Sequence, residues 1–254
     1  MLRKLSSLLL GVLLLQTAQA TVSLPYYDAF NYSEGNLNAV GGPNWVLGSG
    51  STTFEIAVSN AATLSAPAGF PVATGNGLRR APSNSSKRSV LQFTSVPAVD
   101  GNAVFVSFLL NVQTAPAAAQ LIGHLNDSNA SDSTPQAGIF VDAGPKVGIG
   151  KITSTPGFTM ATNLGAGPHL IVVRYLFQTG NDQVDLWVDP ANTNFGAASA
   201  PASLGSTTGG SDPASLDYFQ FITSSTAGGV QFIDEFRVGT AWADVVPSSG
   251  PLLG

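Results

Sequence analysis

The apolar and polar positions of this chain alternate in short runs that are rich in β-branched and aromatic residues. Gly, Pro, Asn, Asp or Ser closes each run, which is the pattern of strands separated by turns. After residue 20 no stretch keeps a helical apolar period for about three turns, so we expect very little helix. The predicted strands cover residues 89–93, 103–112, 138–142, 146–152, 169–177, 183–188, 216–223 and 230–238.

One segment predicts a long β-hairpin. Residues 170–177 form an apolar run, residues 178–182 hold turn-forming residues, and residues 183–188 alternate apolar with polar positions. Such alternation is expected of a strand with one buried face and one face in solvent. Leu186 is therefore predicted to point inward and its neighbour Trp187 to point outward.

Many short strands without intervening helices indicate an all-β fold of two packed antiparallel sheets, a β-sandwich or jelly roll. The stretch 192–211 is rich in Ala, Ser, Gly and Thr, but strong strand patterns flank it, so we interpret it as a long surface loop. We therefore expect a single domain over residues 21–254, with its core at about residues 24–246.

Residues 1–20 have the order of a secretory signal peptide. Arg3 and Lys4 precede an apolar run, and the small-residue pattern Ala18-Gln19-Ala20 marks a cleavage site. The apolar run is shorter than the ~20 residues that a membrane-spanning helix needs. We expect a secreted protein, extracellular, at the cell surface or in the periplasm, with no transmembrane segment in the mature chain.

Composition narrows the function classes. The chain has no cysteine, which excludes disulfides and a lipid-modified N-terminal cysteine. Loss of Arg3 and Lys4 leaves 8 of the 10 basic residues against 15 acidic ones, a net charge of about −7. No nucleic-acid partner is expected, because phosphate binding needs clustered Lys and Arg. The one basic cluster, residues 79–88, is interpreted as a solvated loop.

Both ends of the mature chain carry motifs of one family. Residues 28–37 fit the pattern D-x-F-x-Y-x-x-G-x-L, and residues 233–239 fit I-D-E-x-R-V-G. With the hairpin at residues 169–190, they resemble secreted bacterial laminin-G-like, concanavalin-A-like jelly-roll domains over nearly the whole mature chain. The resemblance implies a concanavalin-A-like jelly roll. Residues 251–254 differ from the sorting tail of many members, so we expect release to the periplasm or medium.

Function follows less directly, because this superfamily holds lectins, carbohydrate-binding modules, adhesive modules and glycoside hydrolases. Its hydrolases carry E-x-D-x-x-E on one strand, whereas none of the three glutamates here, Glu34, Glu55 and Glu235, has that spacing. The nearest acidic pair on a strand is Asp185 and Asp189, and Asp189 precedes a proline, where a turn-forming Asp is expected. We predict no catalytic residue and keep a glycoside hydrolase or lyase with an atypical site as an alternative.

Calcium is the candidate ion. In similar jelly rolls the first and last strands lie side by side, and an acidic residue of the closing strand joins carbonyl groups near the opening strand in one ion site. That role would fall to Asp234, with Asp28 or Glu34 nearby. The alternative is that Asp234 accepts hydrogen bonds from backbone amides of the first strand, or pairs with Arg237, without a metal. The oxygen-rich loop at residues 126–132 is a second candidate.

Glycan binding requires an exposed aromatic ring beside hydrogen-bonding groups. Trp187 is the favoured platform, because its neighbours are predicted to point inward, and Asp185 and Tyr27 are further candidate ligand-binding residues. Trp242 is predicted to close one end of the core. We expect a non-catalytic module that binds a polysaccharide or surface glycan, or an adhesive module. A structural cell-surface or matrix protein without a small ligand stays open as the alternative.

Overall fold

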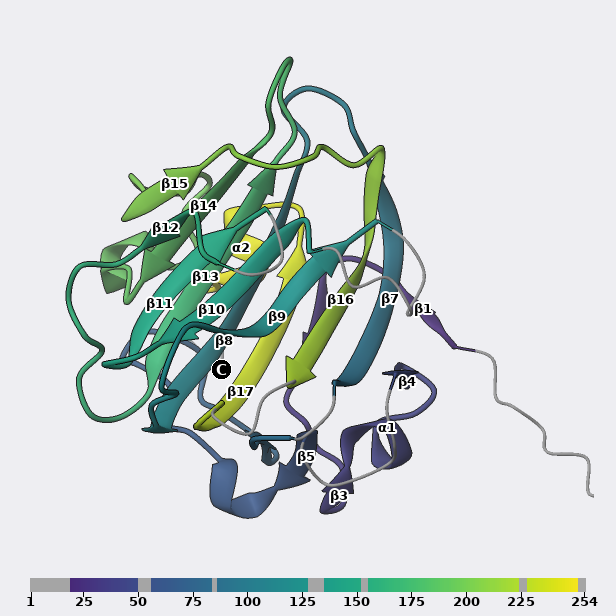
Figure 1. The fold of residues 1–254 in the computed structure, drawn as a ribbon, viewed down its shortest axis with the longest axis vertical. Helices are drawn as coiled ribbons and strands as arrows, with labels where there is room; N and C mark the ends of the chain where they lie inside the picture. Colours follow the sequence, from purple (N-terminus) through teal and green to yellow (C-terminus); the bar gives the residue numbers. More distant parts are fainter. Residues whose placement is uncertain are drawn as a thin grey trace, which may run out of the picture.

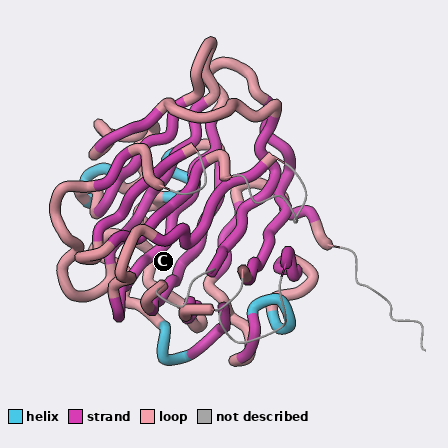
Figure 2. The backbone as a smooth tube through the Cα atoms, viewed as in Figure 1, coloured by secondary structure: helices cyan, strands magenta, loops and turns pink. Residues whose placement is uncertain are grey.

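The computed structural model describes residues 19–49, 56–83, 86–127, 135–151, 155–223 and 228–250. Most of the predicted signal peptide, residues 1–18, lies outside these residues. Over the described part the chain forms two β-sheets packed face to face, with sheet A in front of sheet B in the view of Figure 1. Figure 2 shows how little helix accompanies them. The helices are α1 (Leu37–Val40), η1 (Asn60–Ala62), η2 (Asn192–Asn194) and α2 (Trp242–Val245).

Sheet A has eight strands. Its order is β1 (Thr21–Val22), β7 (Lys87–Pro97), β16 (Ser215–Thr223), β9 (Gln120–Asn126), β10 (Ala137–Asp142), β11 (Lys146–Gly150) and β12 (Phe158–Thr159), and β4 (Trp45–Ser49) also pairs with β7. All neighbours are antiparallel except β1, which runs parallel to β7.

Sheet B has nine strands. Its order is β15 (Gly205–Thr207), β14 (Gln183–Val188), β13 (His169–Leu176), β8 (Ala103–Thr114), β17 (Val230–Gly239), β6 (Gly77–Arg80), β5 (Ile56–Ser59) and β3 (Gly35–Asn36), and β2 (Tyr26–Asp28) also pairs with β17. The all-β sandwich predicted from the sequence is therefore confirmed, and so is the hairpin, which is β13 and β14.

The space between the sheets holds the main hydrophobic core. Inward positions of both sheets fill it, as the alternation of the strands predicts. Six aromatic side chains of this core pack together, and the rings of Trp45 and Phe221 stack with centroids 5.4 Å apart. The ring centroids of Phe219 and Phe236 lie 4.7 Å apart, which joins sheet A to sheet B at this point.

A second apolar layer covers the outer face of sheet B, and it contradicts the prediction that the ring of Trp187 is exposed. Residues 63–72, residues 192–203 and α2 pack over this face, and Ser107 Oγ of β8 donates to the Val245 carbonyl at 2.6 Å. Trp187 does point away from the main core, but this layer covers it and leaves 4% of it exposed. Trp242 lies in the same layer, 5.2 Å from Trp187 between ring centroids, rather than at the end of the main core.

The predicted basic loop is also wrong. Arg80 ends β6 and is 1% exposed, while Lys87 and Arg88 begin β7 and are each 8% exposed. Arg80 donates to the carbonyl oxygens of Ile222 at 2.6 Å, Leu121 at 3.1 Å and Gly228 at 3.3 Å. It also bonds to the Gln231 side chain. Ile222 and Leu121 belong to sheet A and Arg80 to sheet B, so this side chain joins the two sheets rather than facing solvent. Its burial lowers the pKa of Arg80 to about 9.

β2, near the start of the described chain, lies beside the last strand, β17, as the resemblance implies for the opening and closing strands. One edge of β17 carries β6 against Gln231–Ile233 and β2 against Phe236–Val238. Between them the register of β17 shifts, and Glu235 has a left-handed backbone, with φ of 55°. This bulge forms the site described below. None of the described helices is long and apolar enough to cross a membrane.

Candidate functional site

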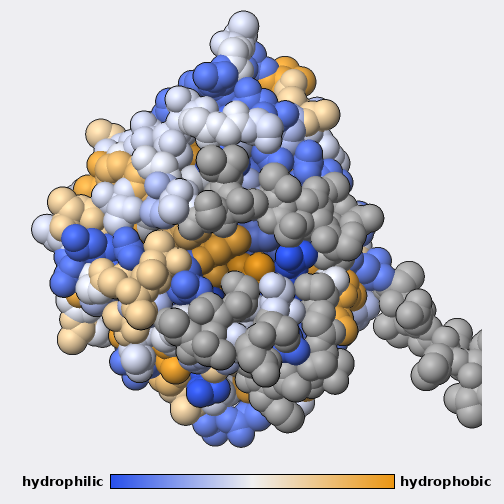
Figure 3. All heavy atoms as spheres, in the orientation of Figure 1, coloured by the Kyte–Doolittle hydropathy of each residue, from blue (hydrophilic) through white to orange (hydrophobic). Residues whose placement is uncertain are grey.

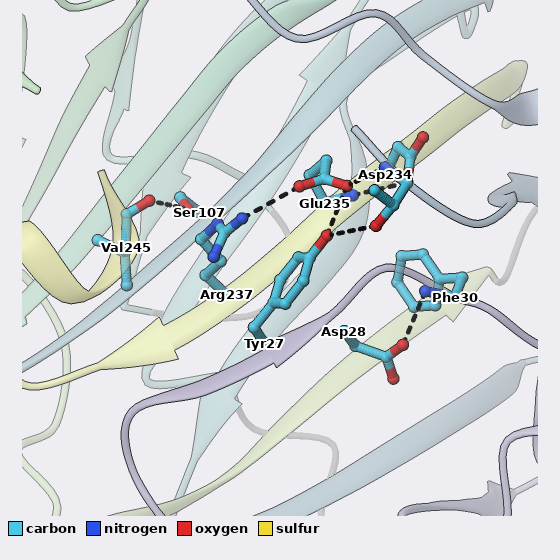
Figure 4. A network of polar contacts seen from close by, with 9 residues as sticks. Tyr27, Asp28, Phe30, Ser107, Asp234, Glu235, Arg237 and Val245 are labelled. Atoms are coloured by element: carbon cyan, nitrogen blue, oxygen red, sulfur yellow. Dashed lines mark hydrogen bonds and ion pairs between the residues drawn. The ribbon is translucent and has the colours of Figure 1, made fainter. Parts of the chain in front are cut away.

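The bulge in β17 directs a buried carboxylate toward the outer face of sheet B. Glu235 is 1% exposed, and its Oε1 accepts from the Tyr27 hydroxyl at 2.7 Å and from the Thr74 backbone N–H at 3.0 Å (Figure 4). Its Oε2 accepts from Arg237 Nη2 at 3.1 Å. A left-handed backbone at a non-glycine residue costs about 1 kcal/mol or more, and such positions cluster at binding and switch sites.

Arg237 fixes the ring of Tyr27. Its guanidinium carbon lies 3.9 Å from the centroid of the Tyr27 ring and 5.3 Å from that of Phe70. Arg237 is 8% exposed, and burial lowers its pKa while the Glu235 carboxylate raises it. Stacking on a desolvated guanidinium is worth about 2 kcal/mol. The ring is therefore held on one face by Arg237 and at its hydroxyl by Glu235.

Tyr27 is nevertheless accessible. It is 41% exposed, whereas every other aromatic residue in the described part of the chain is buried or half-buried. Because Arg237 covers one face, a ligand that stacks on this ring must use the opposite face. Burial of the rest of the side chain, together with the Glu235 carboxylate, raises the pKa of Tyr27 to about 12.

A groove of about 500 Å³ lies near this ring: Ala73 lines it, and the next residue, Thr74, has its hydroxyl 3.2 Å from the Tyr27 hydroxyl. Residues 63–70 line it together with Val72, Ala73 and Ser249. Phe70 lies in its wall, and the Arg237 guanidinium carbon lies 5.3 Å from the centroid of the Phe70 ring. Val72 is 83% exposed at the rim. We call Tyr27 and this groove together the Tyr27 surface.

Asp234 supports the groove from below. Its side chain is fully buried, with Oδ2 accepting from the Leu64 N–H at 2.9 Å and Oδ1 from the Glu235 N–H at 2.8 Å. Burial raises the pKa of Asp234 to about 7, and the nearby Glu235 carboxylate adds to this, whereas the two backbone donors lower it. Of the predicted alternative, one part holds: Asp234 accepts from backbone amides, but these are those of Leu64 and Glu235, and Arg237 pairs with Glu235 instead.

The three predicted calcium ligands do not come together. Asp28 points into the main core, where it accepts from Trp45 Nε1 at 2.7 Å, from the Phe30 N–H at 2.7 Å, and from two tyrosine hydroxyls. Asp234 faces the opposite side of sheet B, because it follows Ile233, which faces the main core, and the bulge comes after it. Glu34 lies elsewhere and accepts from the Asn60 N–H at 3.0 Å. In the described ranges no three His, Cys, Asp or Glu residues form a group able to hold a metal ion.

Two of the three predicted ligand-binding residues are also placed differently from the prediction. Asp185 is 1% exposed and accepts from Arg174 Nε at 2.9 Å and Nη2 at 2.7 Å. Arg174 in turn lies over the Trp187 ring, 5.6 Å from its centroid. Trp187 and Asp185 are thus buried by the layer on sheet B, and only Tyr27 meets solvent. Asp189 forms the expected turn, with φ of 48°.

Sequence reasoning did not identify the loop at residues 63–74. It has no strand periodicity, and nothing in its composition marks Phe70 or Thr74 as partners of β17. Glu235 was considered only for its spacing from other glutamates. Of the oxygen-rich loop at residues 126–132, predicted as a second ion site, residues 128–132 lie outside the described part of the chain.

Two buried polar side chains, Gln220 and His124, lie opposite each other on the outer face of sheet A. The strand register places Gln220 of β16 opposite His124 of β9 and Val90 of β7. All three side chains are fully buried, so in this structure they offer no surface to a ligand. Figure 3, seen from the side of sheet A, shows apolar surface near the middle of this face between polar areas.

Comparison with known proteins supports the fold. A sialidase matches with a TM-score of 0.50 and 11% identity, over 84% of this chain and 19% of the sialidase. The globular domain of T. cruzi calreticulin matches with a TM-score of 0.50 and 12% identity, over 85% of this chain and 87% of that domain. The lectin UEA-II in complex with galactose gives a TM-score of 0.47 and 11% identity, over 85% and 98%. The chain has the concanavalin-A-like sandwich fold.

These likenesses concern the fold alone, since the identities are low. The chain spans about a fifth of the length of the sialidase that it matches. No protein-family model matches the sequence, and no curated protein matches it. Function must therefore be argued from the Tyr27 surface itself.

Proposed function

We propose that this protein is a secreted, non-catalytic β-sandwich module that binds a glycan at the Tyr27 surface. The observation that carries the proposal is an exposed aromatic ring that is rigidly held. Tyr27 is 41% exposed, yet its hydroxyl bonds to Glu235 at 2.7 Å and Arg237 stacks on one face. The free face of such a ring can pack on the apolar face of a sugar.

Rigidity favours binding because less side-chain entropy is lost when the ligand settles. Immobilising a flexible side chain on binding costs about 0.5–1.5 kcal/mol. Here the ring is already immobilised in the free protein, so binding loses less entropy. Thr63, Ser65 and Ser249 line the nearby groove together with apolar residues. A groove with apolar walls and a few fixed polar groups is the usual form of a small-ligand site.

The charges around the ring support a neutral ligand. Glu235 and Arg237 are paired with each other and buried at 1% and 8% exposure, so neither is presented to solvent as a free charge. A polysaccharide contacted through ring stacking and hydroxyl groups fits this surface. Export to the periplasm, the cell surface or the medium, which the signal-peptide pattern predicts, would bring the surface into contact with such polymers.

The test is a titration of the purified mature chain with a panel of neutral and acidic polysaccharides, read as a rise in the thermal midpoint. Tyr27→Ala should weaken binding of the responding polysaccharide about tenfold, which is the value of one aromatic contact. Val99→Ala is the matched control, because Val99 is an exposed apolar residue, at 55%, outside the Tyr27 surface. Equal binding by the wild type and Tyr27→Ala would refute the site.

The same titration with added calcium and with a chelator tests the calcium prediction separately. A chelator-sensitive midpoint that Asp234→Ala removes would establish an ion at the bulge. A chain that responds to no polysaccharide and instead self-associates would favour the structural alternative.

A further inference from the structure

A buried lysine and an aspartate meet beside the turn of the β13–β14 hairpin. Lys151 follows β11, and its side chain is 0% exposed. Its Nζ donates to Asp212 Oδ1 and, at 2.9 Å, to the backbone carbonyl of Asp182. The side chain of Asp212 is 33% exposed, and it lies in the connection between β15 and β16.

The chain is shaped to bring this pair together. Gly210, two residues before Asp212, has φ of 120°, and a Cβ placed there would lie 2.7 Å from Lys151 Cβ and 2.9 Å from the Lys151 carbonyl oxygen. Only glycine allows so close an approach of the loop to Lys151. The loop is therefore pressed against the residue whose side chain its aspartate meets.

The turn of the β13–β14 hairpin holds both reacting groups. The Asp182 carbonyl accepts from Lys151 Nζ at 2.9 Å, and the Asp182 N–H donates to Asp212 Oδ1 at 3.3 Å. The Asp182 carboxylate fixes the turn itself, because it accepts from the Tyr175 hydroxyl at 2.8 Å and from the Gln178 N–H at 2.9 Å. The ring of Tyr175 lies beside the lysine, with Nζ 5.7 Å from its centroid.

We propose that Lys151 and Asp212 become joined by an isopeptide bond, which forms within the folded chain with loss of one water molecule. A proton passes from the ammonium to the carboxylate, which gives an amine and a carboxylic acid. The Nζ lone pair attacks Cγ of Asp212, a C–N bond forms, and the C–OH bond breaks. The hydroxyl leaves with a second Nζ proton as water, and no oxidant, reductant or co-reactant is needed.

The surroundings favour this reaction in three ways. The two groups are held in contact, so the step is intramolecular, and oriented groups can react as if at very high concentration. The Asp182 N–H donates to Asp212 Oδ1, the oxygen that also accepts from Lys151 Nζ, and so holds the carboxyl group in place for attack. Burying the ammonium of Lys151, whose side chain is 0% exposed, is costly, whereas the amide product is neutral. The chain has no cysteine, and this bond would cross-link residues 61 positions apart.

Asp182 is thus a positioning residue, and Lys151 and Asp212 supply the reacting atoms. The bond would tie the end of β11 to the segment that enters β16, both in sheet A, next to the hairpin turn of sheet B.

The decisive measurement is a peptide map of the purified, denatured protein with its intact mass. We expect one branched peptide that contains both residue 151 and residue 212, and an intact mass lower than the sequence mass by one water. Recovery of residues 151 and 212 in separate linear peptides, from a protein of full mass, would overturn the proposal whatever the variants do.

Lys151→Arg keeps the positive charge but removes the nucleophilic amine, so its mass deficit should vanish. Lys146→Arg, at the other end of β11, is the matched control and should keep the deficit. Comparing the two variants cancels any uncertainty about N-terminal processing. A deficit that persists in Lys151→Arg would place the loss of water elsewhere and refute this bond.

Discussion

Asp234 and Glu235, consecutive in the sequence, hold the two ends of one loop. Asp234 binds the N–H of Leu64 at 2.9 Å, and Glu235 binds the N–H of Thr74 at 3.0 Å. A regular strand would send these two side chains to opposite faces of the sheet. The bulge, with its left-handed residue at 235, brings both to the loop, and so the backbone irregularity shapes the groove beside Tyr27.

The first prediction concerns the charge of Glu235. Glu235→Gln keeps an oxygen for Tyr27 and Thr74 but leaves Arg237, which is 8% exposed, without its carboxylate. Breaking a buried pair by neutralising one partner costs about 3 kcal/mol. We expect a loss of that order in the free energy of unfolding, measured with denaturant.

The control for this variant is Glu34→Gln. Glu34 is exposed and accepts from the Asn60 N–H and, at 3.4 Å, from the Ser59 hydroxyl. An amide oxygen can replace its carboxylate there, so the loss should stay below about 1 kcal/mol. Similar losses in the two variants would mean that the Glu235–Arg237 pair adds little to stability.

The second prediction is a pH dependence that comes from Asp234. Burial raises the pKa of Asp234 to about 7 in the folded protein, so the folded state binds a proton that the unfolded state does not. Stability should therefore rise as the pH falls through about 7 and be lost as the pH rises through it. The thermal midpoint, followed across this range, is the measurement.

Asp234→Asn isolates this effect. The burial-raised pKa of Asp217, about 6, contributes a dependence of the same sign, so the wild type and the variant must be compared. The variant has no proton to bind at this position, and its midpoint should change less between about pH 8 and the usual aspartate range. Parallel curves for the two proteins would contradict the assignment to Asp234.

The fold could be predicted from the sequence, because the long strands alternate along their length and the turns carry their own residues. β9 was missed: its run, Gln120–Asn126, has Gly123 at its centre and follows an Ala-rich segment, so it lacks the β-branched signal of its neighbours. The short strands β3, β12 and β15 have two or three residues each, too few for any period to show.

The layer on sheet B could not be predicted, and this is why the prediction for Trp187 failed. Alternation tells which side of a strand a residue takes, but not what covers that side. The covering segments, residues 63–72 and 192–203, are rich in Ala, Ser, Pro and Gly and carry no period. The prediction for Arg80 failed for a related reason. Charged residues are mostly exposed, and only the fold shows that buried carbonyl groups are available as partners.

The third prediction separates Trp187 from Tyr27. Trp187 packs 5.2 Å from Trp242 between centroids, and its Nε1 donates to the Pro201 carbonyl at 3.0 Å. Trp187→Ala should therefore lower the free energy of unfolding by about 3 kcal/mol or more. Tyr27→Ala removes a surface ring and should cost less stability while it weakens glycan binding. A Trp187→Ala protein that keeps full stability would mean that Trp187 lies at the surface and could contact a ligand.

The last prediction compares two neighbouring arginines. Arg80 reaches carbonyl oxygens in β9 and β16 through Nη2 and Nε, whereas the adjacent Arg79 is exposed. A lysine has one compact ammonium and cannot reproduce this fork of donors. Arg80→Lys should leave buried carbonyl groups without partners and cost about 2 kcal/mol, since each such group costs about 1–3 kcal/mol. Arg79→Lys should be nearly neutral, because the side chain remains in water. Chemical denaturation of both variants measures the difference, and equal stabilities would mean that Arg80 does not link the two sheets.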